Sequence, residues 1–184
     1  MKATGIVRRI DELGRVVIPK EIRRTLRIRE GDPLEIFVDR EGGVILRKYS
    51  PVGELTDFAK EYAESIHQAV GHTALICDKD AIVAVSGSGK KELLDRPVSE
   101  AVETVIQERT RVAASAAAGE RMLPITPSDN GGGCTAQLII PIIAAGDPVG
   151  AVILLSREEG ASFDKTDIKV CETAAGFMGR QLGN

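Results

Sequence analysis

The chain has 184 residues, a formal net charge of −3 and three cysteines. This length suits one large or two small domains. The cysteines are far apart and odd in number, and none forms a CxxC pair. This argues against a zinc site or a disulfide framework and favours a reducing setting. The longest apolar stretch, residues 138–145, contains a proline and is too short to span a bilayer, and no apolar run follows the first residues. We therefore expect a cytoplasmic protein with no membrane partner.

Positive charge is concentrated at one end of the chain. Residues 1–50 carry twelve Lys/Arg and eight Asp/Glu, a formal charge of +4, whereas the rest carries twelve basic and nineteen acidic groups, a charge of −7. A basic N-terminal part followed by an acidic remainder indicates a polyanionic partner for the basic part. Pro51 and Gly53 punctuate the chain where the charge changes sign. We predict a first domain over residues 1–50, a linker over 51–55 and a second domain over 56–184.

The basic end is predicted to hold four short strands and one short helix. A tight turn ends at Gly14, which supplies the positive φ that such a turn needs. Pro19 suits the first helical position, and Ile22 and Leu26 form an inward stripe one turn apart. Gly31 is expected to end this helix. The expected strands span residues 4–10, 15–18, 34–38 and 44–47.

Elements this short cannot bury enough apolar surface within fifty residues. No disulfide or metal pattern is present to stabilise them, so oligomerisation is the remaining means. We therefore expect a homodimer through the first domain, with strands interleaved between the two chains. Two-fold symmetry presents each basic side chain twice, which suits a pseudo-symmetric DNA duplex.

Five arginines in seventeen positions are the candidate DNA-binding residues: Arg8, Arg9, Arg15, Arg23 and Arg24. A single exposed arginine is ordinarily a solvated surface charge, but a cluster on so small a module favours a polyanion. Contacts to phosphates release counterions, so binding should weaken steeply with salt. The domain has no long recognition helix. Bases would be read by arginines that reach a groove or through DNA shape, with a preference for deformable, A/T-rich sites.

The second domain is predicted as a mixed α/β body between two amphipathic helices. Asp164 and Asp167 resemble a start signal for the last helix. The first helix carries apolar residues at helical spacing: Leu55, Phe58, Tyr62, Ile66 and Ala69. The last helix has steps of 3, 4, 3 and 4 between Ile168, Cys171, Ala175, Met178 and Leu182. Both helices either only cover a sheet or also form a helical bundle between subunits, and the sequence leaves these alternatives open.

Between these helices, strands and one further helix alternate. Residues 99–108 are expected to be helical, and Gly146-Asp147-Pro148 forms a hairpin turn. The strands are predicted at residues 73–77, 82–85, 138–143 and 149–155. This order of elements, together with the phrase around that turn, is similar to GAF domains, which are small-molecule sensing and dimerisation modules. The resemblance implies a signal-sensing and tetramer-forming domain with an unidentified small-molecule ligand.

Residues 7–19, VRRIDELGRVVIP, resemble the signature of the AbrB-type swapped-hairpin transcription factors of spore-forming bacteria. The match continues through residues 22–26 and 34–39. The resemblance implies an α+β protein in which an N-terminal swapped-hairpin β dimer precedes a GAF-like α/β sandwich flanked by helices. It implies that Arg8, Arg15, Arg23 and Arg24 contact double-stranded DNA and that Arg9 is a basic position beside them. It also implies a nucleoid-associated homotetramer that activates and represses sporulation genes.

Other chemistry has weaker support. Residues 86–91 follow a strand, but a phosphate-binding loop would need Gly at Ala84 and Ser or Thr at Lys91, so a solvated turn is the better interpretation. His67 and His72 lack a metal-binding context. No nucleophile, base or paired-carboxylate arrangement is evident, so we expect neither an enzyme nor a cofactor. Two alternatives stay open: an antitoxin-type DNA-binding protein, and a small-molecule or nucleotide sensor whose second domain is the main functional site.

Overall fold

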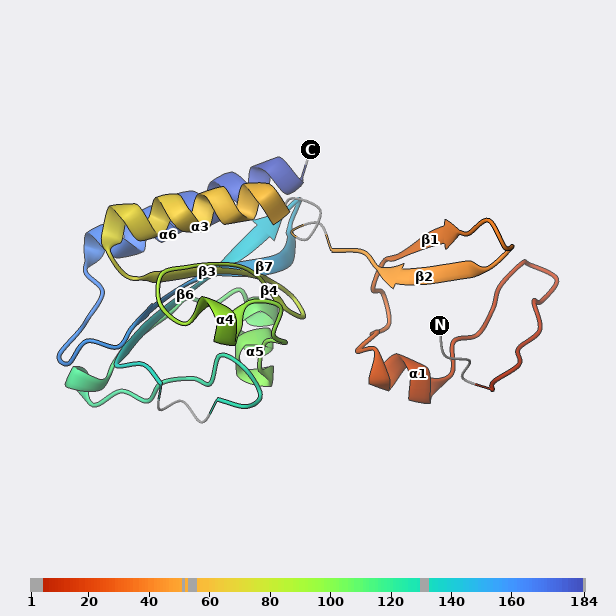
Figure 1. Ribbon diagram of the computed structural model, residues 1–184, viewed down its shortest axis with the longest axis horizontal. Coiled ribbons are helices and arrows are strands. Elements are labelled where there is room, and N and C mark those ends of the chain that lie inside the picture. The colour runs from red at the N-terminus through yellow and green to blue at the C-terminus, as the bar shows by residue number, and fades with distance from the viewer. Residues whose placement is uncertain (1–4, 51, 53–55, 130–132, 184) are drawn as a thin grey trace. The chain divides into compact units, whose positions relative to one another are not determined.

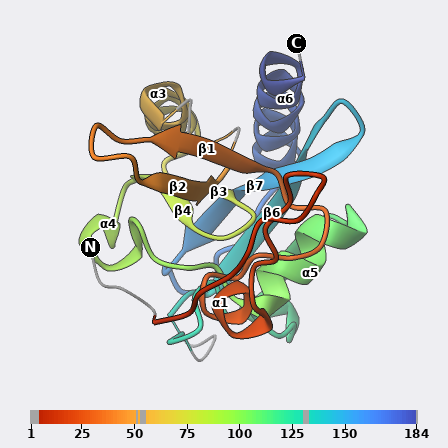
Figure 2. The ribbon, with the colours of Figure 1, turned by 90° about the vertical axis from the view of Figure 1, so that its right-hand side faces the viewer.

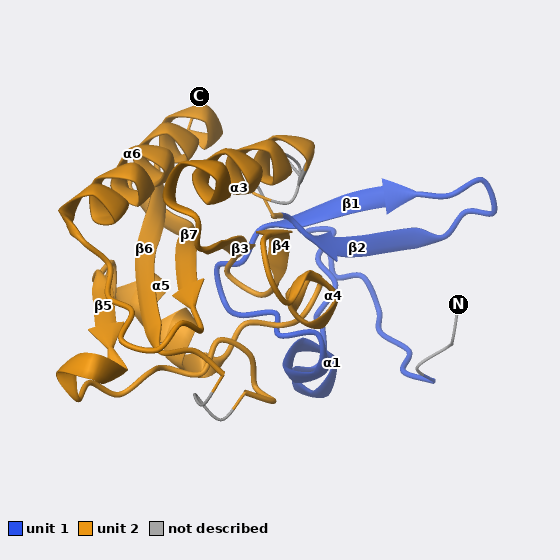
Figure 3. Ribbon diagram, turned by 60° about the vertical axis from the view of Figure 1, so that its left-hand side comes forward, with its two compact units in different colours: residues 1–49 blue, residues 50–184 orange. Residues whose placement is uncertain are grey.

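The computed structural model describes residues 5–50, 52, 56–129 and 133–183. The chain divides into two compact units, Met1–Tyr49 and Ser50–Asn184 (Figure 3). The structure therefore has one small unit that contains all five candidate arginines, and one larger unit that contains both amphipathic helices.

The first unit consists of one short helix and one β-hairpin (Figure 1). Helix α1 spans Lys20–Thr25. Strands β1 (Leu34–Val38) and β2 (Val44–Lys48) pair antiparallel. The turn between them is closed by Asp39, whose carboxylate accepts the N–H groups of Glu41 and Gly43. Both strands predicted in this part of the chain are thus present.

The two strands predicted before the helix are not formed. The turn that joins them is present, since the N–H of Gly14 donates to the carbonyl of Asp11 at 3.0 Å, and Gly14 has a φ of +75°. Residues 5–10 and 15–18 are extended but belong to no strand among the described residues. A strand exists only through hydrogen bonds to a neighbouring strand. Within the described part of the chain, no ladder of such bonds joins these segments to another strand.

Helix α1 ends at Thr25, earlier than Gly31. The N–H of Arg27 donates to the carbonyl of Arg24, and that of Ile28 donates to the carbonyl of Arg23, which is a Schellman motif. Arg27 occupies the left-handed position of this motif, with a φ of +52°. The predicted inward stripe is correct only in part, because Ile22 is half-buried and Leu26 is 55% exposed.

Large apolar side chains of the first unit are unusually exposed. Val7 is 87% exposed and Leu13 75%. Pro19 is the one buried residue among the described positions 5–49. The exposed set is Ile6, Val7, Ile10, Leu13, Val16, Val17, Leu26, Ile36, Phe37, Val38, Val44, Leu46 and Tyr49. An exposed apolar surface of this extent is typical of an interface rather than of a free surface.

The second unit is a five-stranded antiparallel sheet with helices on both faces (Figure 1). The strand order is β4-β3-β7-β6-β5. The strands are β3 (Thr73–Asp78), β4 (Ile82–Ser86), β5 (Val112–Ser115), β6 (Ala136–Ala144) and β7 (Asp147–Ser156). The helices are α3 (Thr56–Val70), α4 (Lys90–Leu93), α5 (Glu100–Glu108), the 3₁₀ turn η1 (Ala116–Ala118) and α6 (Lys165–Leu182).

The sheet separates two apolar clusters. Helices α3 and α6 pack on one face, where Ile76 and Leu154 are buried, and α5 packs on the other, where Leu75 and Ile153 are buried. Successive strand residues point to opposite faces, so a sheet covered on both sides needs unbroken apolar strands. This explains why the central strands were predictable. Strand β5 and helix α4 were missed because each has only four residues.

The start signal predicted for α6 is confirmed. The carboxylate of Asp164 accepts the N–H groups of Thr166 and Asp167, and that of Asp167 accepts the N–H of Asp164 at 2.9 Å. This reciprocal arrangement is a capping box.

The two amphipathic faces differ in how well they were predicted. On α6, Cys171, Ala175 and Met178 are buried as expected. On α3, Ile66 is buried, but Ala69 is exposed, and Leu55 lies outside the described residues. The buried stripe of α3 instead contains the alanines at positions 59 and 63. Small side chains let the helix approach the sheet closely, and the larger aromatic residues lie at its flank.

Candidate nucleic-acid interface

The five candidate arginines are all exposed. Arg8 and Arg9 lie in the extended segment, Arg15 follows the turn, and Arg23 and Arg24 occupy the last turn of α1. Both α1 and the extended segment lie to one side of the β1–β2 hairpin (Figures 1 and 2). The structure thus places all five cations on the surface of one small unit. Their contact with DNA stays a prediction.

The turn before Arg15 is organised by a single carboxylate. Asp11 Oδ1 accepts the N–H groups of Leu13 at 3.0 Å and Arg15 at 2.8 Å, and Asp11 Oδ2 accepts Arg15 Nε at 2.8 Å. The backbone hydrogen bond from Arg15, and then its guanidinium, lower the pKa of Asp11 below its ordinary value. Sequence reasoning treated this residue only as part of a turn, although aspartate is typical of turns because it binds the backbone ahead of it.

The end of α1 suits cations and is tied to the hairpin. Helix carbonyls point out of the last turn, and positive side chains such as Arg23 and Arg24 are favoured there. Lys48 Nζ donates to the carbonyl of Arg27 at 3.0 Å and lies 3.2 Å from the Asp32 carboxylate. Strand β2 therefore holds the segment that follows the helix. No local pattern marks Lys48 for this contact, since its partner is 21 residues away in the chain.

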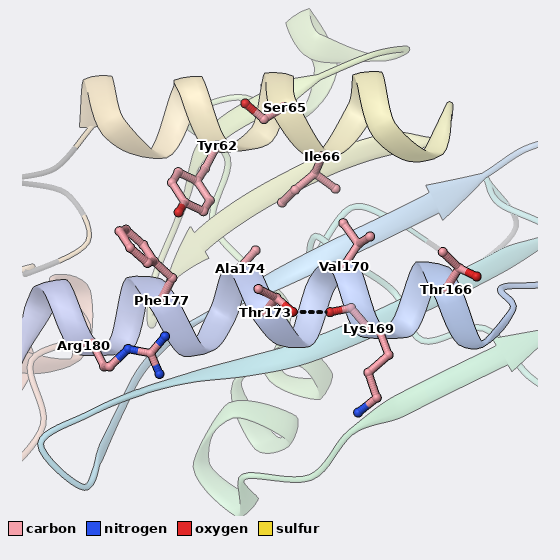
Figure 4. A pocket seen from close by; sticks show the side chains of 10 residues that line it. All are labelled: Tyr62, Ser65, Ile66, Thr166, Lys169, Val170, Thr173, Ala174, Phe177 and Arg180. Carbon is pink, nitrogen blue, oxygen red and sulfur yellow. Dashed lines mark hydrogen bonds between the residues drawn. The ribbon is translucent and has the colours of Figure 1, made fainter.

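In the second unit, a groove of about 580 Å³ runs between α3 and α6 (Figure 4). The rings of Tyr62 and Phe177 stack with centroids 5.4 Å apart, and the Phe58 ring lies tilted against Tyr62 with centroids 4.9 Å apart. Lys169 and Arg180 contribute the positive charge of the groove. An apolar channel between two surface helices suits a further helix or a second copy of the same pair.

A smaller pocket of about 230 Å³ lies between α4 and the end of β7. Its charged lining comprises Glu92, Asp129 and Arg157, and Arg157 lies 3.6 Å from the Glu92 carboxylate. The half-buried Cys134 also lines it, and burial raises the pKa of this thiol, with Asp129 adding to the effect. The lining carries two carboxylates against one cation, so it disfavours phosphates.

The described ranges contain no metal-binding cluster and no membrane-spanning helix. None of the groups of His, Cys, Asp and Glu found there is arranged to hold a metal ion. His67 Nδ1 lies 2.7 Å from the carbonyl of His72, so this ring closes a turn after α3. Over the same residues, no helix is both long and apolar enough to cross a membrane.

Comparison with known proteins identifies the family. Residues 54–183 match the family described as "Stage V sporulation protein T C-terminal, transcription factor". The chain is 54% identical over 182 residues to Stage V sporulation protein T of Bacillus subtilis (strain 168), with 99% of each chain covered. The chain belongs to the stage V sporulation protein T family. The predicted resemblance to AbrB-type regulators is confirmed with it.

Each unit of this family member has relatives of its own. Residues 7–54 match the family "Antidote-toxin recognition MazE, bacterial antitoxin". The same end is 60% identical over 63 residues to Transition state regulatory protein AbrB of Bacillus subtilis (strain 168), covering 31% of this chain and 65% of AbrB. The structure resembles the second GAF domain of DevS from Mycobacterium smegmatis, with a TM-score of 0.55 and 14% identity over 72% of this chain and 93% of that one. The α+β fold with a GAF-like body is confirmed.

Proposed function

We propose that the chain is a DNA-binding transcription regulator of sporulation genes that both activates and represses. Residues 1–50 form its DNA-binding domain, 51–55 its linker and 56–184 a GAF-like domain for sensing and assembly. Membership of a family described as transcription factors supports this assignment. The observation that best supports DNA binding is the charge of +4 on residues 1–50, where all five candidate arginines are exposed.

The DNA-binding domain acts as a homodimer. Its thirteen exposed large apolar side chains need a cover, and its two extended segments need strand partners. A second copy supplies both when the hairpins of the two chains interleave. The AbrB-like sequence of this end supports the same arrangement. Dimerisation also doubles each arginine around a two-fold axis, which matches the symmetry of a duplex.

The arginines contact DNA in two ways. Arg23 and Arg24 stand at the exposed end of α1 and neutralise phosphates, and Arg8, Arg9 and Arg15 reach towards base edges from the extended segment. Phosphate contacts position a protein on DNA without reading sequence. Deformable, A/T-rich promoter sites are favoured because a module without a long recognition helix depends on the shape of the duplex.

A salt titration of full-length protein on an A/T-rich duplex tests this function. Each phosphate contact contributes about 0.9 to the slope of log K against log salt, so Arg23→Ala should flatten the slope by roughly 1.8 per dimer. Arg40→Ala is the matched control, because Arg40 is an exposed cation on the β1–β2 turn. Equal slopes for the wild type and Arg23→Ala remove Arg23 from the contacts. Equal losses in both variants show only a general charge effect.

The GAF-like domain joins two dimers into a tetramer through the α3–α6 groove. The occupant is the same helix pair of a second copy, because the groove is apolar and α3 exposes acidic residues such as Glu61 and Glu64, which complement Arg180 of α6. Light scattering after gel filtration measures this: Phe177→Glu should give dimers, and Gln181→Glu, on an exposed position of the same helix, should give tetramers. A wild-type protein that runs as a dimer contradicts the assembly.

The two alternative functions have less support. The match to an antitoxin family covers residues 7–54 only, and the remainder folds around a five-stranded sheet rather than forming a short toxin-wrapping tail. The pocket beside Arg157 is the place we assign to a small ligand, and its excess of carboxylates favours zwitterions or cations over nucleotides. A saturable rise in Tm with ATP or GTP contradicts that preference. We assign no catalytic activity.

A further inference from the structure

Asp11 and Arg15 form a unit within the DNA-binding domain that exceeds an ordinary surface ion pair. One oxygen of Asp11 accepts two backbone N–H groups, from Leu13 and Arg15, and this anchors the carboxylate to the turn. The other oxygen accepts Arg15 Nε at 2.8 Å. The backbone therefore orients the carboxylate, and the carboxylate orients the guanidinium.

The way in which the guanidinium is held matters for recognition. A guanidinium carries five donors in a rigid planar fork, and Nε occupies one corner of it. Asp11 engages Nε, so this contact does not use the edge formed by the two terminal nitrogens. That paired edge is the one that binds the O6 and N7 acceptors of guanine, or two phosphate oxygens, with two parallel hydrogen bonds. The Arg15 side chain is 69% exposed, which leaves it accessible to a DNA duplex.

We propose that Asp11 is a positioning residue for DNA recognition, because it holds the Arg15 fork ready to read the duplex. The inference rests on the proposed function, in which Arg15 contacts DNA. Asp11 itself does not touch the DNA. Its role is to remove the rotational freedom of a long side chain before binding, so that less entropy is lost when the complex forms. Because the gain depends on geometry, it is large where the fork meets a matching base edge and small on DNA that lacks one.

Charge repulsion alone predicts a different effect of removing Asp11 on DNA binding. A carboxylate near a phosphate backbone repels it, so removing Asp11 should strengthen binding to every duplex. If Asp11 positions Arg15, its removal should instead weaken the discrimination between the preferred site and other DNA. The two roles differ in the ratio of specific to non-specific affinity, which a charge change alone leaves constant.

Asp11→Asn separates the two roles. The amide oxygen of asparagine still accepts the two backbone N–H groups, so the turn is retained, while its NH₂ group faces the N–H of Arg15 Nε and the contact is lost. Glu12→Gln is the matched control, since Glu12 is an exposed neighbour in the same turn and the change removes the same charge. Arg15→Ala and the double variant Asp11→Asn/Arg15→Ala complete a double-mutant cycle, which measures the coupling between the two residues.

The measurement is fluorescence anisotropy of full-length protein at fixed salt, on an A/T-rich promoter duplex and on a random duplex of equal length. An exposed ion pair restrains a side chain by a factor of no more than about five, so Asp11→Asn should lower the affinity ratio by up to roughly 25-fold per dimer. Glu12→Gln should leave the ratio unchanged, and Asp11→Asn should have no further effect in the Arg15→Ala background.

Each outcome decides between these possibilities. Equal ratios for Asp11→Asn and Glu12→Gln overturn the positioning role and leave the proposed function intact. A drop in the ratio that persists in the Arg15→Ala background also overturns it, because Asp11 then acts through another group. Wild-type protein that binds neither duplex contradicts the proposed function itself, and the inference with it.

Discussion

Gly179 allows α6 to lie against the end of strand β6, and its replacement by alanine tests how the second unit is packed. A methyl group at Gly179 would be within van der Waals overlap of the carbonyl oxygen of Ile143 and 3.0 Å from its carbonyl carbon. Both atoms belong to the backbone, so no side chain can rotate away. Carbon and carbonyl oxygen rest no closer than about 3.3 Å, so the end of the helix must move by on the order of 1 Å.

Two effects oppose each other in this substitution. Alanine is a better helix former than glycine by about 1 kcal/mol. Overpacking a well-packed interface costs about 1–3 kcal/mol. We expect a net loss of up to about 2 kcal/mol in the free energy of unfolding, and each kcal/mol lowers Tm by roughly 4 °C for a domain of this size.

Gly176→Ala provides the control within the same helix. Gly176 is exposed, and an added methyl group there meets no atom within 4 Å, so only the helix-forming term remains. This variant should gain about 0.5–1 kcal/mol. Urea unfolding followed by circular dichroism gives both free energies. If Gly179→Ala is as stable as Gly176→Ala, the close approach of α6 to β6 is wrong.

Two further predictions concern groups buried in the second unit. Gln137 is fully buried and binds both backbone groups of Leu123, accepting the N–H at 2.6 Å and donating to the carbonyl at 3.0 Å. Gln137→Leu should lower the free energy of unfolding by about 2–4 kcal/mol because two backbone groups lose their partner, and calorimetry that shows no change would falsify this. Burial raises the pKa of the Cys77 and Cys171 thiols to about 12, so both stay protonated at pH 8. A thiol-reactive dye should therefore label only Cys134 in native protein, slowly and faster as the pH rises, and all three in denaturant; rapid native labelling of two thiols contradicts the fold.

Several elements were predictable because their signals are local. The Asp164–Asp167 capping box, the positive φ of Gly14 and the apolar runs of the central strands each involve residues within a few positions of one another. Local hydrogen bonds and side-chain alternation suffice to specify them.

The predictions from sequence were wrong where the structure of a segment depends on residues far away in the chain or in another copy. The strands expected before α1 need hydrogen bonds from another strand, and Leu26 needs an apolar surface that a single copy does not supply. On α3, the small residues at positions 59 and 63 share the buried stripe with Ile66, whereas Phe58 and Tyr62, which the spacing favoured, are only partly buried. Helical periodicity identifies a face only to within one residue of rotation.

By itself, the sequence determined the two-part organisation, the basic N-terminal end, the arginine cluster and most helices and strands of the GAF-like body. These follow from composition and short-range patterns. Only the tertiary structure decided that Asp11 holds Arg15 by its Nε, that Lys48 ties β2 to the segment after α1, and that Tyr62 and Phe177 line one groove. The last two contacts join residues more than twenty positions apart, and the first depends on the rotamer of a long side chain. A linear pattern specifies none of the three, because packing within each unit sets the two long-range contacts and a side-chain rotamer sets the first.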